Sequence, residues 1–303
     1  MEYDVVIVGC GPAGLSAAVY ACRAGLHVLM LDAGAPGGKI NLTAELENWP
    51  GDQRVAGPEL AYRMYEHAIS LNAQYEYGRV VKIIDHKEKK EVVCETQSYE
   101  APAVIIASGT KERKMGLAKE EELTGRGVSY CAVCDGPFFK DEAVIVVGGG
   151  NSALQEAEYL TKFASVVHLV VRRDVFRADK AVSDKIIHHD KVKIHFLRKP
   201  VEILEADHKV AGLVVADSVT GEKETIEAKA IFPFVGLDPV TDFVSDLGIT
   251  DEQGYILTDE NMQTKIKGIY AAGDVRKKML RQVVTATNDG AIAAQAIAHA
   301  LGA

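Results

Sequence analysis

The sequence lacks an excess of basic residues. Among its 303 residues, 34 are Lys or Arg and 43 are Asp or Glu, which gives a formal net charge of −9 at pH 7. It has no basic tail and no long basic run, so a nucleic acid is not an expected partner. The acidic balance fits a soluble cytoplasmic enzyme, although many other proteins share it.

Cysteine is also scarce. The chain has five cysteines, an odd and sparse set that does not suit the disulfide framework of a secreted protein. We therefore expect a reducing, cytoplasmic environment, in which any disulfide is transient and catalytic. Three of the five, Cys10, Cys22 and Cys94, fall in apolar strand or helix patterns and are expected to be buried structural residues.

A long uninterrupted apolar run is missing as well. Residues 5–22 carry no formal charge, but glycines and one proline interrupt this segment near its start. The charged residues before it, Glu2 and Asp4, are acidic, whereas a signal peptide begins with basic residues. A buried strand followed by a buried helix explains the segment better than a membrane span, so no membrane partner is expected.

What the sequence does contain is an ordinary globular composition, with 48% hydrophobic and 25% charged residues. Its length predicts about two domains. Two dinucleotide-binding patterns occupy much of the chain and agree with that number.

The first dinucleotide-binding pattern starts with an apolar strand at Asp4–Val8. A GxGxxG turn, a helix through Ala24 and a second strand, His27–Leu31, follow it. The first glycine permits a tight turn, the second lets the backbone approach a pyrophosphate, and the third packs helix against strand. The acid after the second strand suits ribose hydroxyls. The predicted binding residues are Gly9, Gly11, Pro12, Ala13, Gly14 and Asp32.

The second pattern repeats the first with a different ending. A strand at Ala143–Val147, a glycine turn, a helix to about Lys162 and a strand at Val166–Val171 follow one another. Arginines then stand where the ribose 2′ position should lie, which favours a 2′-phosphate and hence NADP, although a solvated surface would look the same. Two such sites suggest FAD and NADPH, two cofactors that exchange electrons. The predicted NADPH residues are Gly148, Gly150, Asn151, Ser152, Arg172, Arg173 and Arg177.

The C-terminal third and the segment near residue 105 complete the first domain. Gly268–Asp274 is predicted to be a short strand that ends in Gly-Asp, ahead of an Ala-rich helix at Val283–Leu301. Asp274 could bind a ribityl chain or merely cap a turn, and the pattern leaves both open. Val104–Gly109 is a strand running into small residues, among them Ala107 and Gly109. These suit close passage beside a flat cofactor, or a plain strand end.

The predicted fold is α/β, with two Rossmann-like dinucleotide-binding domains. The FAD domain comprises residues 1–109 and 240–303, and the NADPH domain, residues 110–239, is inserted in it. The two adjacent crossings form a plausible hinge. Alternating stretches at Lys209–Asp217 and Glu224–Phe232 are predicted to be antiparallel strands.

The segment Cys131-Ala132-Val133-Cys134-Asp135 lies in the inserted domain. Two thiols at this spacing can close into a disulfide, hold a metal or carry electrons. Structural zinc needs four ligands, and the chain has no second C-x-x-C and no zinc-finger spacing around His188 and His189. Redox chemistry is the favoured interpretation and no metal is expected.

Eight segments in order resemble the low-molecular-weight thioredoxin reductase family of bacteria, and the resemblance covers nearly the whole chain. The segments are Gly9–Gly14, Gly37–Gly38, Glu47–Gly51, Cys131–Asp135, Gly148–Ala153, Arg172–Arg177, Gly273–Asp274 and Arg281–Gln282. The resemblance implies a homodimer whose FAD and NADPH domains rotate against each other. It also extends the FAD site to Gly37, Gly38, Lys39, Asn48, Gly273, Asp274, Arg281 and Gln282.

The chain departs from the family at two positions. Val171 stands where the family's arginine motif usually begins with His, and Lys39 stands where Gln usually follows the Gly-Gly pair. The three arginines are retained, so NADPH remains the expected donor. A cation at Lys39 could shift the flavin potential, or its side chain could point to solvent.

The resemblance also implies roles for the dithiol residues. Cys134 would be the thiol nearer the flavin, and Cys131 the thiolate that attacks the disulfide of thioredoxin. Asp135 would be the general acid, with a pKa raised by burial, or a helix N-cap. Arg126, Phe138 and Phe139 flank the dithiol, and exposed aromatic residues there suit a docking surface, although one Phe could belong to the core.

Two related activities would share most of these motifs. One is a ferredoxin-dependent thioredoxin reductase, a type that typically loses the second glycine turn or the arginines, both of which this chain keeps. The other is an NADPH-dependent reductase of a small-molecule disulfide.

Overall fold

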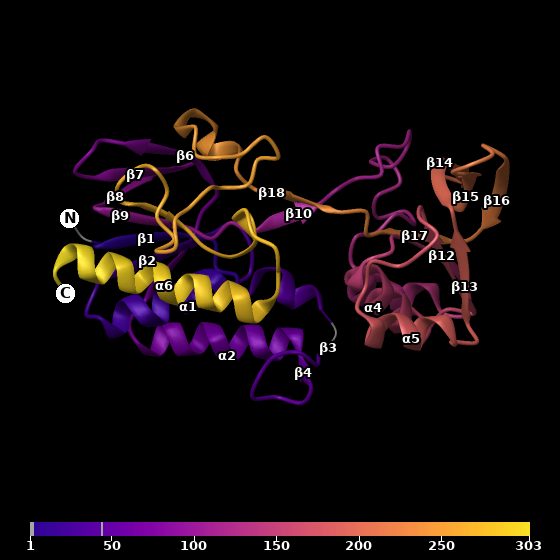
Figure 1. The fold of residues 1–303 in the computed structure, drawn as a ribbon, viewed down its shortest axis with the longest axis horizontal. Coiled ribbons are helices and arrows are strands. Elements are labelled where there is room, and N and C mark those ends of the chain that lie inside the picture. The colour runs from indigo at the N-terminus through magenta and orange to yellow at the C-terminus, as the bar shows by residue number, and fades with distance from the viewer. Residues whose placement is uncertain (1–2, 44) are drawn as a thin grey trace. The chain divides into compact units, whose positions relative to one another are not determined.

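The computed structural model of the chain describes residues 3–43 and 45–303 and divides it into two compact units. Unit 1 comprises Met1–Lys111 and Asp238–Ala303, and unit 2, Glu112–Leu237, is inserted in it (Figure 1). The chain passes between the units twice, at β10 (Thr110–Glu112) and β18 (Leu237–Pro239), which pair in a two-stranded sheet.

Unit 1 is built on a five-stranded parallel sheet with the order β19-β9-β1-β2-β5. The central strands are apolar throughout, because both faces of the sheet are covered. The strands are β1 (Val5–Val8), β2 (Val28–Asp32), β5 (Gln74–Tyr77), β9 (Ala103–Ile106) and β19 (Ile269–Ala271).

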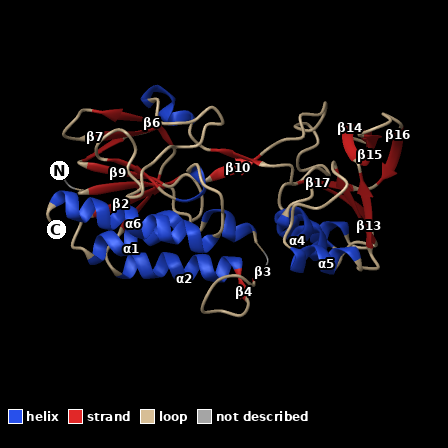
Figure 2. Cartoon of the chain, viewed as in Figure 1, coloured by secondary structure: helices blue, strands red, loops and turns tan. Residues whose placement is uncertain are grey.

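Three helices cover one face of this sheet, and an antiparallel sheet covers the other (Figure 2). The helices are α1 (Pro12–Arg23), α2 (Gly57–Ser70) and α6 (Val283–Leu301), and the antiparallel strands are β6 (Val80–Asp85), β7 (Lys90–Cys94) and β8 (Ser98–Ala101). Alternate residues of each central strand enter the two cores: Ile7 packs toward the helices and Val6 toward the antiparallel sheet. Shorter elements are η1 (Gly38–Leu42), β3 (Glu45–Leu46), β4 (Val55–Ala56), η3 (Asp242–Leu247) and η4 (Gly273–Val275).

Unit 2 repeats this architecture on a smaller scale. A four-stranded parallel sheet, ordered β13-β12-β11-β17, has helices on one face and a three-stranded antiparallel sheet on the other. The parallel strands are β11 (Ala143–Val147), β12 (Val166–Val171), β13 (Val192–Phe196) and β17 (Ala230–Pro233). The remaining elements are α3 (Ala132–Asp135), η2 (Gly136–Phe139), α4 (Asn151–Leu160), α5 (Lys180–Ile187), β14 (Arg198–Ala206), β15 (Lys209–Asp217) and β16 (Lys223–Glu227).

The prediction of one antiparallel strand over Glu224–Phe232 is wrong. The segment forms β16, antiparallel to β15, and then β17, parallel to β11. The change of sheet occurs at two adjacent residues: the N–H of Ala228 still donates to the Ala211 carbonyl, and the N–H of Lys229 already donates to the Ala143 carbonyl. Both sheets suit the same apolar pattern, so the pattern alone did not reveal the break.

The free cysteines only partly match their prediction. Cys10 and Cys94 are buried, whereas Cys22 is half-buried on α1. Residues 5–22 form β1 and all of α1 except its last residue, as expected. Within the described ranges, no helix is both long and apolar enough to cross a membrane.

A buried lysine stabilises the hairpin between β6 and β7. The side chain of Lys90 is only 1% exposed, and its Nζ donates to Asp85 Oδ1 at 2.7 Å and to the Lys87 carbonyl at 2.6 Å. The hydrogen bond from Lys90 is the largest cause of a lowered Asp85 pKa. The Asp85 carboxylate also accepts the Lys87 N–H at 2.9 Å, so Lys90 is one of two donors to Asp85 and also donates to the Lys87 carbonyl.

We predict that Lys90→Met lowers the free energy of unfolding by about 1–3 kcal/mol at neutral pH, because it removes the cation beside Asp85 and the side-chain donor to the Lys87 carbonyl. Since the folded-state pKa of Asp85 is lowered, the stabilisation is fully present above about pH 4 and is lost as the pH falls through the lowered pKa. The free energies of unfolding of the wild type and Lys90→Met, measured by denaturant titration, should therefore converge as the pH becomes acidic. Lys82→Met, which breaks the exposed pair with Asp246, is the control and should leave the free energy of unfolding nearly unchanged. An equal decrease in the free energy of unfolding in Lys90→Met and Lys82→Met would contradict a stabilising role for the buried lysine.

Candidate redox and dinucleotide-binding sites

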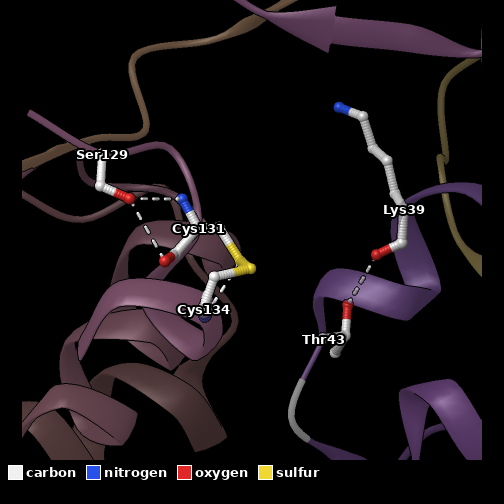
Figure 3. The surroundings of a disulfide bond; sticks show 5 residues. All are labelled: Lys39, Thr43, Ser129, Cys131 and Cys134. Atoms are coloured by element: carbon white, nitrogen blue, oxygen red, sulfur yellow. Dashed lines mark hydrogen bonds between the residues drawn. A yellow bond between two sulfur atoms is a disulfide. The ribbon is translucent and has the colours of Figure 1, made fainter. Parts of the chain in front are cut away.

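Cys131 and Cys134 form a disulfide at the start of α3, with their Cα atoms 5.3 Å apart. Cys131 is the N-cap residue, and its Sγ accepts a hydrogen bond from the Cys134 N–H at 3.1 Å (Figure 3). The Ser129 hydroxyl accepts the Cys131 N–H at 3.1 Å. Cys134 is exposed and Cys131 partly exposed, so a second molecule can reach the pair.

Asp135 follows the disulfide as the last residue of α3 and the N-cap residue of η2. Its side chain makes no capping hydrogen bond, which disfavours the purely structural interpretation. The residue is only partly buried, so the burial expected of a general acid is incomplete.

The two phenylalanines after the disulfide differ in environment. Phe138 is 80% exposed, whereas Phe139 packs edge-on against Phe232 in the core of unit 2, with ring centroids 6.1 Å apart. Of the pair, Phe138 alone therefore presents an apolar ring to a partner.

The first glycine turn is closely packed at both ends and open in the middle. A Cβ at Gly9 would lie 2.3 Å from the Ala107 carbonyl oxygen, and one at Gly14 would lie 1.9 Å from the Gly9 carbonyl oxygen. A Cβ at Gly11 would meet nothing within 4 Å. The turn thus leaves space beside Gly11, where a pyrophosphate approaches in this motif.

Asp32, at the end of β2, is tied to this turn. Its carboxylate accepts the N–H of Cys10 at 2.6 Å and that of Gly34 at 2.8 Å. Each carboxylate oxygen retains a further lone pair, so both remain able to accept a ribose hydroxyl.

Segments distant in sequence meet at the same turn. Gly38, at the start of η1, approaches Gly11, since a Cβ there would lie 3.2 Å from the Gly11 Cα. Gly273 approaches Ala13 in the same way, at 2.8 Å from the Ala13 Cβ. Gly37, the residue before Gly38, has a φ of +114°, a conformation that L side chains rarely adopt.

Asp274 is a partly buried carboxylate whose buried Oδ1 has unused hydrogen-bonding capacity. Within residues 3–43 and 45–303, its Oδ1 has no hydrogen-bond partner. Burial raises its pKa, and the nearby charges of Lys278, Lys39 and Arg281 partly oppose that rise. A buried acceptor without a partner is rare in a finished structure, so this one fits a hydroxyl-bearing ligand such as the ribityl chain of FAD.

The neighbouring acid, Asp289 on α6, is by contrast engaged through its Oδ2. Its carboxylate pairs with Arg276 at 2.9 Å and Lys278 at 2.7 Å, and it accepts the Gly273 N–H at 3.0 Å. These bonds fix the loop that carries Asp274. The sequence analysis missed this cluster, although one acid in an Ala-rich helix was a usable signal.

Arg281 and Gln282 also take part in this loop. The Arg281 guanidinium donates to the Asp274 and Arg276 carbonyls and lies over the Tyr255 ring, with its Cζ 4.2 Å from the centroid. Gln282 is the N-cap of α6, and its Oε1 accepts from Asn48 Nδ2 at 3.0 Å.

The carbonyl groups of Lys39 and Gly109 both accept hydrogen bonds from within the chain. The Lys39 carbonyl accepts the hydroxyl of Thr43, the residue after η1 (Figure 3). The positive charge of the Lys39 side chain acts to lower the pKa of Asp274. Gly109 lies just before β10, where its φ of +67° turns the chain and its carbonyl accepts the Val240 N–H.

The second glycine turn, in unit 2, repeats the packing of the first. A Cβ at Gly148 would lie 2.5 Å from the Phe234 carbonyl oxygen, and one at Gly150 would meet nothing within 4 Å. Val171, where the family usually has His, is 2% exposed and fills the space beside Gly149. It is therefore a core residue.

The arginines lie beside this turn. The Arg177 N–H donates to the Gly149 carbonyl at 2.7 Å, which joins the arginine segment to the glycines. Arg172, Arg173 and Arg177 are exposed, and within the described chain their guanidinium groups have no ion pair or hydrogen bond. Ser152 is exposed at the start of α4, while Asn151 exchanges two hydrogen bonds with Asp179.

Comparison with known proteins places these sites in context. A model of the pyridine nucleotide-disulphide oxidoreductase family matches residues 3–290. The thioredoxin reductase of Bacillus subtilis is 48% identical over 297 residues, covering 98% of this chain and 94% of that protein. The thioredoxin reductase of Listeria monocytogenes is 48% identical over 293 residues, covering 97% and 92%. The crystal structure of Lactococcus lactis thioredoxin reductase matches with a TM-score of 0.96 at 46% identity, covering 98% of each chain.

We predict that Asp274→Asn has opposite effects on ligand binding and on stability. Loss of the carboxylate acceptor should weaken FAD binding roughly tenfold, as measured by flavin fluorescence. Since burial raises the folded-state pKa, the charge destabilises the ligand-free fold at neutral pH, and this penalty disappears as the pH falls toward about 4. The FAD-free variant should therefore melt at a higher temperature than the FAD-free wild type at pH 7.

The control is Asp242→Asn, whose side chain is 91% exposed in the wild type and which should change neither quantity. Unchanged FAD affinity in Asp274→Asn would remove Asp274 from the binding site.

Proposed function

Because the chain belongs to the pyridine nucleotide-disulphide oxidoreductase family and is similar over nearly its whole length to thioredoxin reductases, we propose that it reduces thioredoxin. Electrons pass from NADPH through FAD and the Cys131–Cys134 disulfide to the disulfide of oxidised thioredoxin. The observation that carries this proposal is the accessible disulfide in the unit that also holds the arginine-flanked glycine turn.

FAD, when bound, accepts a hydride and delivers two electrons to a disulfide. The open turn at Gly11 and the unsatisfied carboxylate of Asp274 fit its pyrophosphate and its ribityl chain. The proposed FAD residues are those of the first glycine turn with Asp32, the η1 segment Gly37–Lys39, Asn48, Ala107, Gly109 and the loop residues Gly273, Asp274, Arg281 and Gln282.

NADPH is assigned to unit 2. The exposed guanidinium groups beside the open Gly150 supply the charge that a 2′-phosphate needs. The same features support NADPH over ferredoxin as the electron donor, since a ferredoxin-dependent enzyme has no use for them.

The dithiol carries out the exchange. Once two electrons have opened the disulfide, Cys131 as a thiolate attacks one sulfur of the thioredoxin disulfide and releases the other as a thiolate. Cys134 then attacks the Cys131 sulfur of this mixed disulfide, which re-forms the Cys131–Cys134 bond and frees reduced thioredoxin. Asp135 adjoins the pair and donates a proton to a leaving sulfur. Phe138 offers an apolar contact to the partner.

The assembly and location are proposed from the family. A homodimer would give a mass in light scattering of twice the 32.7 kDa of the chain, and a monomer mass would refute it. A cytoplasmic location agrees with the sparse cysteines, and fractionation of cells would test it.

The proposed function is tested by mixing the purified protein with FAD, NADPH and oxidised thioredoxin and following NADPH consumption. We expect rapid oxidation that depends on thioredoxin. Activity with reduced ferredoxin but not NADPH would instead favour the ferredoxin-dependent reductase. Activity with a small disulfide but not with thioredoxin would favour the second alternative.

We further predict that Arg172→Ala and Arg177→Ala each raise the KM for NADPH roughly tenfold, because each removes a charged partner of the 2′-phosphate. The KM for NADH, which lacks this phosphate, should stay unchanged, and so should both values in Arg79→Ala, a control in unit 1. An equal rise in the KM values for NADPH and NADH would show that the arginines do not recognise the 2′-phosphate.

A further inference from the structure

We propose that Glu120 and Tyr130 are positioning residues for the dithiol: the hydrogen bond between them holds Cys131 in the geometry that disulfide exchange requires. This inference rests on the proposed function of the Cys131–Cys134 pair. Neither residue belongs to a glycine turn, the arginine segment or the C-x-x-C motif.

Glu120 is a rigid anchor. Its side chain is 2% exposed, and its carboxylate accepts the N–H groups of Met115 at 2.8 Å, Gly116 at 2.8 Å and Leu117 at 3.3 Å. A fourth donor is the Tyr130 hydroxyl, 2.7 Å from Oε1. Four donors from two segments compensate for burial of the carboxylate and fix its position.

Tyr130 transfers this constraint to the residue beside it, the Cys131 N-cap. Its ring packs partly buried against the core that contains Leu123 and Val128. Burial and the bond to Glu120 both raise its pKa, so the hydroxyl remains protonated and keeps donating. Tyrosine is the residue that supplies both an apolar ring for this core and a donor at its far end.

The constraint extends to the sulfur through the backbone. Ser129 is fixed on one side by its N–H bond to the Ile231 carbonyl at 3.0 Å, and its hydroxyl accepts the Cys131 N–H. Tyr130 is fixed on the other side by Glu120. With the backbone held at both residues, the Cys131 sulfur lies over the Cys134 N–H, which donates to it at 3.1 Å.

Thiol–disulfide exchange needs an attacking sulfur in line with the bond that it breaks, so freedom at Cys131 lowers the rate. The anchor lies in unit 2 and touches neither of the glycine turns, so flavin reduction does not depend on it. Loss of the anchor should therefore lower kcat for thioredoxin and the reactivity of reduced Cys131, with KM and flavin reduction unchanged.

The test is Tyr130→Phe, which removes the hydroxyl and keeps the ring. Glu120 then retains its three backbone donors, so the variant should fold, with a melting temperature lowered by no more than a few degrees. We expect kcat with thioredoxin to fall roughly three- to tenfold at constant KM, as for the loss of one hydrogen bond. Alkylation of Cys131 by iodoacetamide, in the dithiothreitol-reduced protein at fixed pH, should slow by a similar factor. NADPH-driven reduction of ferricyanide should match the wild type.

The matched control is Tyr62→Phe. Tyr62 on α2 also donates to a glutamate, Glu66 Oε1 at 2.5 Å, but it lies in the other unit and is 60% exposed. This variant should retain wild-type values in every assay. A double-mutant cycle combines Tyr130→Phe with Glu120→Gln. The decreases in kcat should be non-additive, because both variants disturb the hydrogen bond between Tyr130 and Glu120.

Two results would overturn the proposal: wild-type kcat and alkylation rate in Tyr130→Phe, or a raised KM with unchanged kcat, which would make Tyr130 a contact for thioredoxin. The alkylation assay contains no thioredoxin. If the wild-type protein fails to reduce thioredoxin, the proposed function fails, and the positioning role is still decided by alkylation.

Discussion

Close backbone packing at the end of the first parallel strand governs both units. In unit 1 the carbonyl oxygen of Ala107 occupies the space that a Cβ on Gly9 would need, at 2.3 Å, and in unit 2 the Phe234 carbonyl does the same for Gly148, at 2.5 Å. These contacts hold each glycine turn against the neighbouring strand end at the carboxyl edge of its sheet. The positions that stay open, Gly11 and Gly150, are those where a phosphate can approach free N–H groups.

Near the first glycine turn, two carboxylates differ in whether their hydrogen-bonding capacity is used within the chain. Asp289 is satisfied by two cations and a backbone N–H, and it holds the loop that begins at Gly273. Asp274, the next residue in that loop, keeps an oxygen without a partner and a raised pKa. One acid thus stabilises the fold, and the other is the one we propose as a ligand for FAD, as expected where binding takes precedence over stability.

The sequence predicted those elements whose signal is local. The strands Ala143–Val147 and Val166–Val171 and the helix Val283–Leu301 have their predicted ends, because turns or caps bound each apolar run. The split of Glu224–Phe232 was missed because its two halves differ only in the sheet they join. The Asp289 and Glu120 clusters were not predicted, because no spacing rule pairs an acid with a Lys or Tyr donor ten or eleven residues away.

The Cys131–Cys134 pair is the proposed carrier of electrons from flavin to thioredoxin. This role is tested most directly by replacing Cys131 with serine and measuring, in one preparation, NADPH-driven reduction of thioredoxin and of ferricyanide. We expect thioredoxin reduction to fall to the background rate while ferricyanide reduction continues, because the flavin is still reduced and only the exchange step is lost. Thioredoxin reduction at the wild-type rate in Cys131→Ser would contradict the account.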